Sequence, residues 1–174
     1  MRTPSDDAEY LKFAATLRGQ NIPITLIGAG DEMHFGAVTM KVIWPVNSRA
    51  DAPSRNNDSI VLQLSLGNRK ILMTGDVEKS GEAAILNMKT DLGTDVVKVP
   101  HHGSRTSSTD GFVSAAHPQL AIISVGRTSV FGHPNIEVVE RWQAYGAEVM
   151  TTGRRGTITV TTDGSELHVD TFIK

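Results

Sequence analysis

The stretch Ile71-Leu72-Met73-Thr74-Gly75-Asp76 is an apolar run that breaks at a glycine and ends in a carboxylate. About twenty-five residues later, Val96-Val97-Lys98-Val99-Pro100 repeats this design and leads into His101-His102-Gly103-Ser104. Both runs predict buried strands of an α/β sheet, and ligands commonly bind where such strands end. A carboxylate and an imidazole at neighbouring strand ends can converge on one ion. The two segments therefore favour metal-assisted hydrolysis.

The composition is that of an ordinary globular chain. Its 174 residues are 39% hydrophobic and 21% charged, which is enough for one domain with a core. No apolar run approaches the ~20 residues of a membrane helix, and the polar, acidic start does not resemble a signal peptide. The net charge of -2 gives no general attraction to nucleic acid, although Arg154-Arg155 can attract it locally. Because there is no cysteine, any metal must be held by His, Asp, Glu or water.

Strands and helices alternate along the middle of the chain. Capping and periodicity predict helices at 5–18 (with Ser5 as N-cap), 77–88, 112–116 and 134–145 (with Pro134 in its first position). Apolar and alternating runs predict strands at 24–27, 38–44, 59–66, 69–73, 95–99, 120–125, 148–151, 157–161 and 167–172. Gly67-Asn68 is a turn dipeptide that joins two of these strands in a hairpin. This order predicts an α/β domain with a mixed sheet, and a polar loop at 47–58.

Asp76 has two interpretations. An Asp that follows a glycine and precedes Val77-Glu78-Lys79 is a good helix N-cap. Alternatively, its two carboxylate oxygens can bridge two cations in a hydrolytic site. The residues leave both roles open.

His101 and His102 are expected to act differently from each other. Neighbouring side chains of an extended chain point to opposite faces, so only one of them should ligate a given metal. The other would orient that ligand or contact substrate. His133, in Phe131-Gly132-His133-Pro134, is either a helix-entry residue or a substrate-contacting imidazole. The candidate substrate-binding residues are Asn57, Ser59, Ser104 and His133.

A resemblance emerges when the motifs are taken in order. They are Asn57-Asp58-Ser59, Leu72–Asp76, Lys98–Ser104, Ile123-Ser124, Gly132-His133-Pro134 and Thr152-Gly153 up to Gly156. This series resembles the carboxyl-terminal metallo-β-lactamase-like domain of the ComEC family of DNA-uptake competence proteins. The resemblance implies a partial αββα sandwich over residues 1–174, with mixed sheet layers and flanking helices. It also implies a site for two divalent ions, zinc or manganese, in the complete domain.

The same resemblance implies roles for the site residues. Asp76 would bridge the two ions, and His102, or else His101, would ligate the second. The reaction would be phosphodiester cleavage of the DNA strand that is not imported, with single-stranded DNA and the remainder of a membrane channel protein as partners. The chain would be a soluble domain of an inner-membrane protein on its periplasmic or extracellular side. Two alternatives stay open: a hydrolase of this fold acting on another phosphoester or a lactone, and a degenerate, non-catalytic interaction domain.

The main metal-binding signature of that superfamily, His-x-His-x-Asp-His, does not occur in this sequence. We therefore expect the chain to begin after it, so that the domain is truncated at its N-terminal side. Asp76 and the histidine pair then supply two or three donors, and even one catalytic zinc usually has three protein ligands. We expect weak or no metal binding and little activity from this chain alone. An incomplete sandwich would also expose an apolar face, which predicts self-association.

Overall fold

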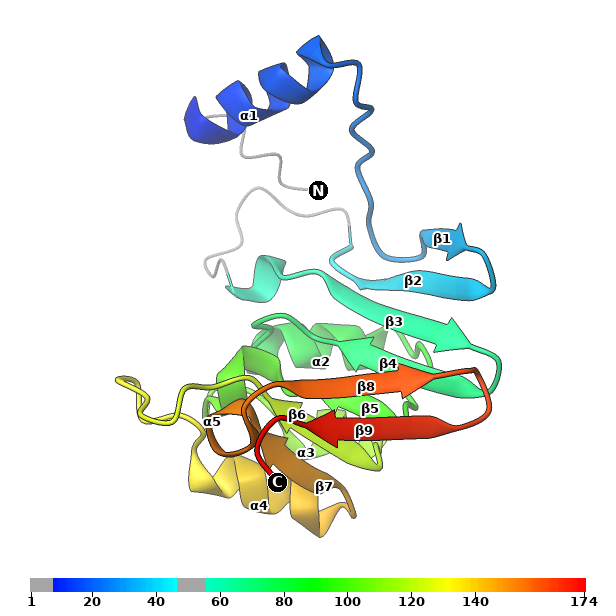
Figure 1. The fold of residues 1–174 in the computed structure, drawn as a ribbon. Coiled ribbons are helices and arrows are strands. Elements are labelled where there is room, and N and C mark those ends of the chain that lie inside the picture. The colour runs from blue at the N-terminus through cyan, green and yellow to red at the C-terminus, as the bar shows by residue number, and fades with distance from the viewer. Residues whose placement is uncertain (1–7, 47–55) are drawn as a thin grey trace.

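A seven-stranded mixed sheet organises the chain (Figure 1). The computed structural model describes residues 8–46 and 56–174, so the expected Ser5 cap and most of the 47–58 loop lie outside it. The strands follow each other across the sheet in chain order; the first four are antiparallel, and β4 to β7 are parallel. They are β1 (Glu32–Phe35), β2 (Val38–Trp44), β3 (Val61–Leu66), β4 (Arg69–Met73), β5 (Val96–Lys98), β6 (Leu120–Ile123) and β7 (Glu148–Thr151).

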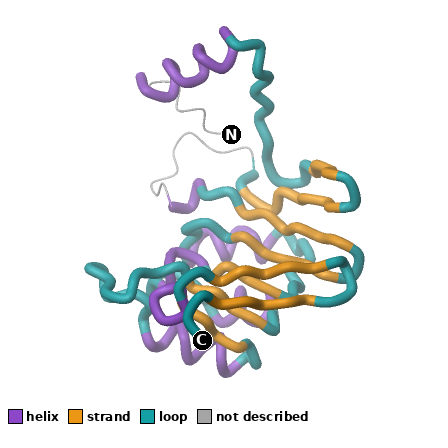
Figure 2. The backbone as a smooth tube through the Cα atoms, viewed as in Figure 1, coloured by secondary structure: helices purple, strands orange, loops and turns teal. Residues whose placement is uncertain are grey.

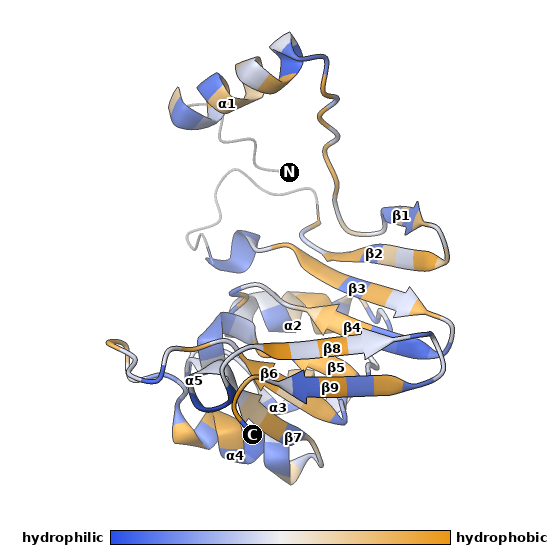
Figure 3. Cartoon of the chain, in the orientation of Figure 1, coloured by the Kyte–Doolittle hydropathy of each residue, from blue (hydrophilic) through white to orange (hydrophobic). Residues whose placement is uncertain are grey.

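Three helices pack against the central strands and close the core. Trp142, Phe112 and Ile85, one from each helix, are fully buried in one cluster with Leu72 and Ile123 of the sheet. Figure 3 shows the hydrophobic residues concentrated in these central strands. The helices are α1 (Ala8–Gly19), α2 (Lys79–Asn87), α3 (Asp110–Ala116), α4 (Ile136–Ala144) and the one-turn α5 (Thr152–Arg155), with 3-10 turns at Asn56–Asp58 and Pro100–Gly103.

β8 (Ile158–Thr162) and β9 (Leu167–Thr171) form a separate hairpin. In Figure 1 this hairpin lies in front of the seven-stranded sheet, and α2 and α3 lie behind the sheet. Its turn is tied to the β3–β4 turn, because Asn68 N donates to Gly164 O at 2.8 Å and Arg69 Nε donates to Ser165 O at 2.7 Å. Helix α1 stands apart from the sheet on a long loop (Figure 2). Among the described residues, no helix has the length and hydropathy to cross a bilayer.

The structure confirms the predicted α/β class, the mixed sheet and the flanking helices. The Gly67-Asn68 hairpin is also confirmed, with Leu66 opposite Arg69. The more specific assignment to an αββα sandwich of the metallo-β-lactamase type stays a prediction.

Three of the expected elements are wrong in detail. Residues 24–27 form no strand, because Ile24 and Leu26 find no neighbouring strand and stay exposed. Helix α2 begins at Lys79 rather than Val77. Pro134 lies before α4, which Asn135 caps by accepting a hydrogen bond from Glu137 N at 3.0 Å. The hydrophobic pattern of the sequence also gave no prediction of β1, which is a short and mostly exposed edge strand.

Candidate functional site

Two hydrogen bonds and a glycine turn hold Asp76 at the end of β4. Thr74 Oγ1 donates to Lys98 O at 2.6 Å and ties the ends of β4 and β5 together. Gly75 then turns the chain at a φ of +57°, and a Cβ there would lie 2.6 Å from the Cβ of Ser59. Asp76 N donates to Ser59 Oγ at 2.9 Å. The backbone of Asp76 is therefore fixed in place, while its side chain stays 41% exposed.

The helix-capping interpretation of Asp76 is wrong. Helix α2 begins three residues later, and its first amides are satisfied from elsewhere in the chain. Asn57 Oδ1 accepts from Glu78 N at 2.9 Å and from Gly81 N at 3.2 Å. Because Asn57 serves as the cap, both Asp76 oxygens are free of that task.

The two histidines occupy a left-handed turn rather than an extended chain. His101 has φ 48° and ψ 43°, and His102 has φ 55° and ψ 24°. Such a conformation costs a non-glycine residue about 1–2 kcal/mol, and strain of this kind clusters at functional sites. The expectation of an extended backbone is wrong, but the rings do diverge. His102 Nε2 lies 3.6 Å from Asp76 Oδ1, and His101 Nδ1 lies 3.5 Å from Glu78 Oε1.

The hydrogen bond of His102 selects its tautomer. Nδ1 lies 2.6 Å from the carbonyl oxygen of Ser124, which can only accept, so Nδ1 carries the proton. In the neutral ring, Nε2 then directs its lone pair toward Asp76 Oδ1. A histidine that ligates a metal usually donates its other ring N–H in this way. The geometry therefore favours His102 over His101 as a metal ligand.

Asp76 and His102 fit part of a divalent-metal site. Within residues 8–46 and 56–174, no group of three or more His, Asp or Glu side chains could hold an ion. A catalytic zinc usually takes three protein ligands. The described residues thus supply a half-site of two donors and need further ligands to complete it.

Lys98 adds a positive charge that motif reasoning did not assign to the site. Its Nζ lies 3.9 Å from Asp76 Oδ1 and donates to Gly75 O at 3.2 Å. Burial lowers the pKa of Lys98, and the neighbouring Asp76 carboxylate opposes that shift. The sequence did carry a signal for this role, because Lys98 is a single charged residue within the apolar run Val96–Val99.

A second polar cluster surrounds His101. Thr106 Oγ1 donates to Glu78 Oε1 at 2.9 Å and lies 3.4 Å from His101 Nδ1. The His133 ring centre lies 6.0 Å from that of His101 and 6.1 Å from that of Phe131. Burial, and then the charges of the two other histidines, lower the pKa of His133, so it is largely neutral at pH 7.

The other predicted substrate-binding residues hold the site together from within. Asn57 Nδ2 donates to Ser80 Oγ at 2.7 Å in addition to capping α2. Ser59 supports Asp76, and the buried Ser104 has its Oγ 3.0 Å from Thr106 Oγ1. The fourth predicted substrate-binding residue, His133, lies beside the histidine pair. Substrate contact by any of them stays a prediction.

Comparison with known proteins identifies several competence proteins. ComE operon protein 3 of Bacillus subtilis (strain 168) is 33% identical over 147 residues, which cover 84% of this chain and 19% of that protein. Recombination protein 2 of Haemophilus influenzae is 33% identical over 78% of this chain and 17% of its own length. Competence protein ComA of Neisseria gonorrhoeae is 33% identical over 59% of this chain and 15% of its own length. The chain thus spans under a fifth of the curated relatives it matches. No protein-family model matches it.

Proposed function

The chain belongs to the ComEC-like competence proteins, and we propose that it contributes one half of a metal-dependent phosphodiesterase site acting on DNA during uptake. The names of the relatives support the competence role. The observation that carries the chemistry is the Asp76–His102 pair, in which two hydrogen-bond acceptors face each other at 3.6 Å. Either a cation between these two groups or a proton on Nε2 makes this contact attractive.

Each residue of the pair has a defined task in this proposal. Asp76 and His102 hold the ion, and the Ser124 carbonyl orients the imidazole. A bound zinc or manganese ion supplies Lewis-acid stabilisation of the charge that develops on phosphate oxygens. Lys98 lies close enough to Asp76 to balance its negative charge. The neutral His133 stands beside the pair of histidines, where it can exchange a proton or a hydrogen bond with substrate.

The proposal also concerns the surroundings of the domain. The remaining metal ligands come from outside the described residues. Single-stranded DNA is the substrate, the rest of a membrane channel protein is the partner, and the domain faces the periplasm or the exterior. These points rest on the relationship to competence proteins.

The test is cleavage of a single-stranded oligonucleotide with Mn²⁺ or Zn²⁺ by the protein that carries this domain at its natural length. Asp76→Asn and His102→Ala should each lower the rate at least about a hundredfold, because each removes a ligand. Asp170→Asn and His168→Ala remove the same groups at exposed positions of β9 and should leave the rate unchanged. Cleavage that survives the loss of Asp76 would remove this pair from the mechanism.

A non-catalytic interaction domain is the second candidate. It is favoured by one observation, that the described residues supply two donors rather than three. In that case the natural-length protein would bind no divalent ion and cleave no DNA, yet natural transformation would still require the domain. Hydrolysis of a small phosphodiester or a lactone without DNA cleavage would instead indicate a hydrolase of another substrate.

A further inference from the structure

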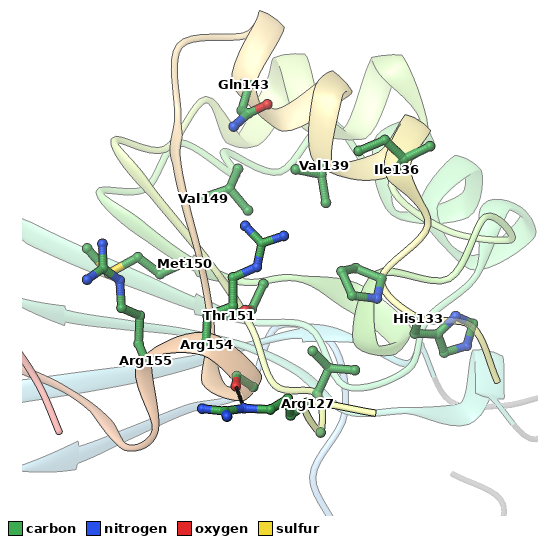
Figure 4. A pocket seen from close by; sticks show the side chains of 14 residues that line it. Arg127, His133, Ile136, Val139, Gln143, Val149, Met150, Thr151, Arg154 and Arg155 are labelled. Carbon is green, nitrogen blue, oxygen red and sulfur yellow. Dashed lines mark hydrogen bonds between the residues drawn. The ribbon is translucent and has the colours of Figure 1, made fainter. Parts of the chain in front are cut away.

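A cavity of about 780 Å³ lies between α4, β7 and α5 (Figure 4). Arg127, Arg154 and Arg155 line it, and no Asp or Glu is among its lining residues. None of the ion pairs formed within the described part of the chain involves these three arginines. We call this feature the arginine cavity. Figure 4 shows Arg154 directed into it and Arg155 beside Met150.

The arginines stand on a rigid piece of backbone. Thr152 Oγ1 accepts from Val125 N at 2.8 Å and donates to Val125 O at 2.9 Å, which locks α5 to the segment after β6. A Cβ on Gly153 would lie 2.9 Å from Arg127 N, so glycine permits this close approach. Arg127 Nε also donates to Gly153 O at 3.3 Å. Three arginines thus line one cavity that has no carboxylate in its lining, an arrangement that a bound anion would stabilise.

The arginine cavity adjoins the candidate metal site. Its wall residue Val125 directly follows Ser124, whose carbonyl oxygen holds His102. Its wall residue His133 lies 6.0 Å, centre to centre, from the His101 ring. A flexible anionic chain bound in the cavity would therefore lie next to the two histidines.

The rest of the cavity suits unpaired bases. Val139, Val149 and the 64%-exposed Ile136 form apolar walls. At the rim, Phe131 is 81% exposed and stacks on His133 with an interplanar angle of 27°. Exposed rings beside a cationic groove bind single strands through base stacking, a contact that the paired bases of a duplex cannot make.

We propose that the arginine cavity binds the phosphodiester backbone of single-stranded nucleic acid and leads that strand toward the Asp76–His102 pair. Its role as an entry to a catalytic centre rests on the proposed function. Binding of the strand does not, because it needs no metal. The two can therefore be tested apart.

The experiment measures fluorescence anisotropy of a labelled 20-nucleotide oligodeoxythymidylate with the full 174-residue chain, in EDTA and at several salt concentrations. Replacing Arg127 and Arg154 together by alanine should weaken binding about tenfold at low salt. It should also reduce the slope of log K against log salt by about 1.4, because each phosphate contact to a single strand contributes about 0.7. Arg18→Ala, on the exposed surface of α1, is the matched control and should change neither quantity.

Several outcomes would overturn the proposal. These are unchanged binding by the double variant, an equal loss with Arg18→Ala, or equal affinity for a duplex of the same length. Arg154→Lys should retain most of the affinity that Arg154→Gln loses, which separates charge from folding. If the arginine double variant weakens strand binding in EDTA but Asp76→Asn still cleaves DNA in the natural-length protein, the proposed function fails while the arginine cavity stands.

Discussion

His101 and His102 are neighbours in the chain, but their rings face different carboxylates. Two successive left-handed residues turn one ring toward Glu78 and the other toward Asp76. The carbonyl oxygen of Ser124 then leaves Nε2 of His102 as the nitrogen available to a ligand. In the proposed metal site, the ligand atom of the histidine pair is therefore Nε2 of His102.

Titration of the chain with Zn²⁺ alone should perturb the His102 ring first, as followed by ¹H–¹⁵N spectra of the histidine side chains. Binding should be weak because only Asp76 and His102 converge among the described residues. His102→Ala should abolish the response, whereas His101→Ala should preserve it. A tight pair of divalent ions per chain, or a first response at His101, would contradict the assignment.

Glu82 makes stability depend on pH in a definite direction. Its buried carboxylate accepts from Ser108 N and Thr109 N at 2.5 and 2.8 Å. Burial raises its pKa above the usual 4.5, against the opposing effect of these hydrogen bonds and of Arg141. The folded state therefore keeps this proton longer than the unfolded state does. The stabilisation that Glu82 contributes is fully present below about pH 4.5 and is lost as the pH rises through the folded-state pKa.

Urea denaturation between pH 4 and 8, in roughly half-unit steps, checks this sign against Glu82→Gln, which cannot titrate. The free energy of unfolding of the native chain, minus that of the variant, should fall as pH rises and then level off. A difference that stays constant or grows with pH would show that the folded state does not favour the protonated carboxyl.

The turn between β4 and α2 shows how elements position the site. The 57–60 segment holds this turn in three ways. It packs so close to Gly75 that a Cβ there would clash, Ser59 accepts a hydrogen bond from Asp76 N, and Asn57 caps α2. The short turn is therefore held by residues about seventeen or more positions away in the chain. Asp76 depends on this packing for its position.

Gly75→Ala should destabilise the chain by about 2–3 kcal/mol, because it combines a left-handed φ with a clash against Ser59. Gly36→Ala is the matched control: its φ is +59°, yet a Cβ there meets nothing within 4 Å. The control should lose only about 1 kcal/mol, the cost of the backbone conformation alone. Equal losses in urea denaturation would show that the Ser59 contact is unimportant.

In the whole molecule, helices α2, α3 and α4 bury their apolar side chains against the sheet, but apolar surface stays exposed elsewhere. Helix α1 carries Leu11 and Phe13 at 48% and 61% exposure, and Leu26 in the following segment is 55% exposed. A shallow cavity of about 470 Å³ between α1 and residues 21–26 extends this surface. Apolar area of this kind favours association.

Sedimentation velocity should therefore show association that grows with protein concentration. Phe13→Ser together with Leu26→Ser should reduce it, because each change removes exposed apolar area. Val130→Ser with Phe172→Ser is the control, since these residues are 90% and 84% exposed in other parts of the fold. A monomer at all concentrations, or an equal effect of the control, would contradict the prediction.

Local pattern was sufficient for the central strands, the Gly67-Asn68 hairpin and the placement of Asp76 and the histidines at strand ends. Apolar runs, turn residues and glycines act over a few positions, where backbone sterics and burial decide the outcome. Contacts between distant segments decided the rest. They include the cap from Asn57, the approach of Lys98 to Asp76, the carbonyl of Ser124 behind His102, and the arginine cavity. These hydrogen bonds and charge placements exist only after the strands pair and α4 packs, because no periodicity in the chain encodes which distant groups will meet.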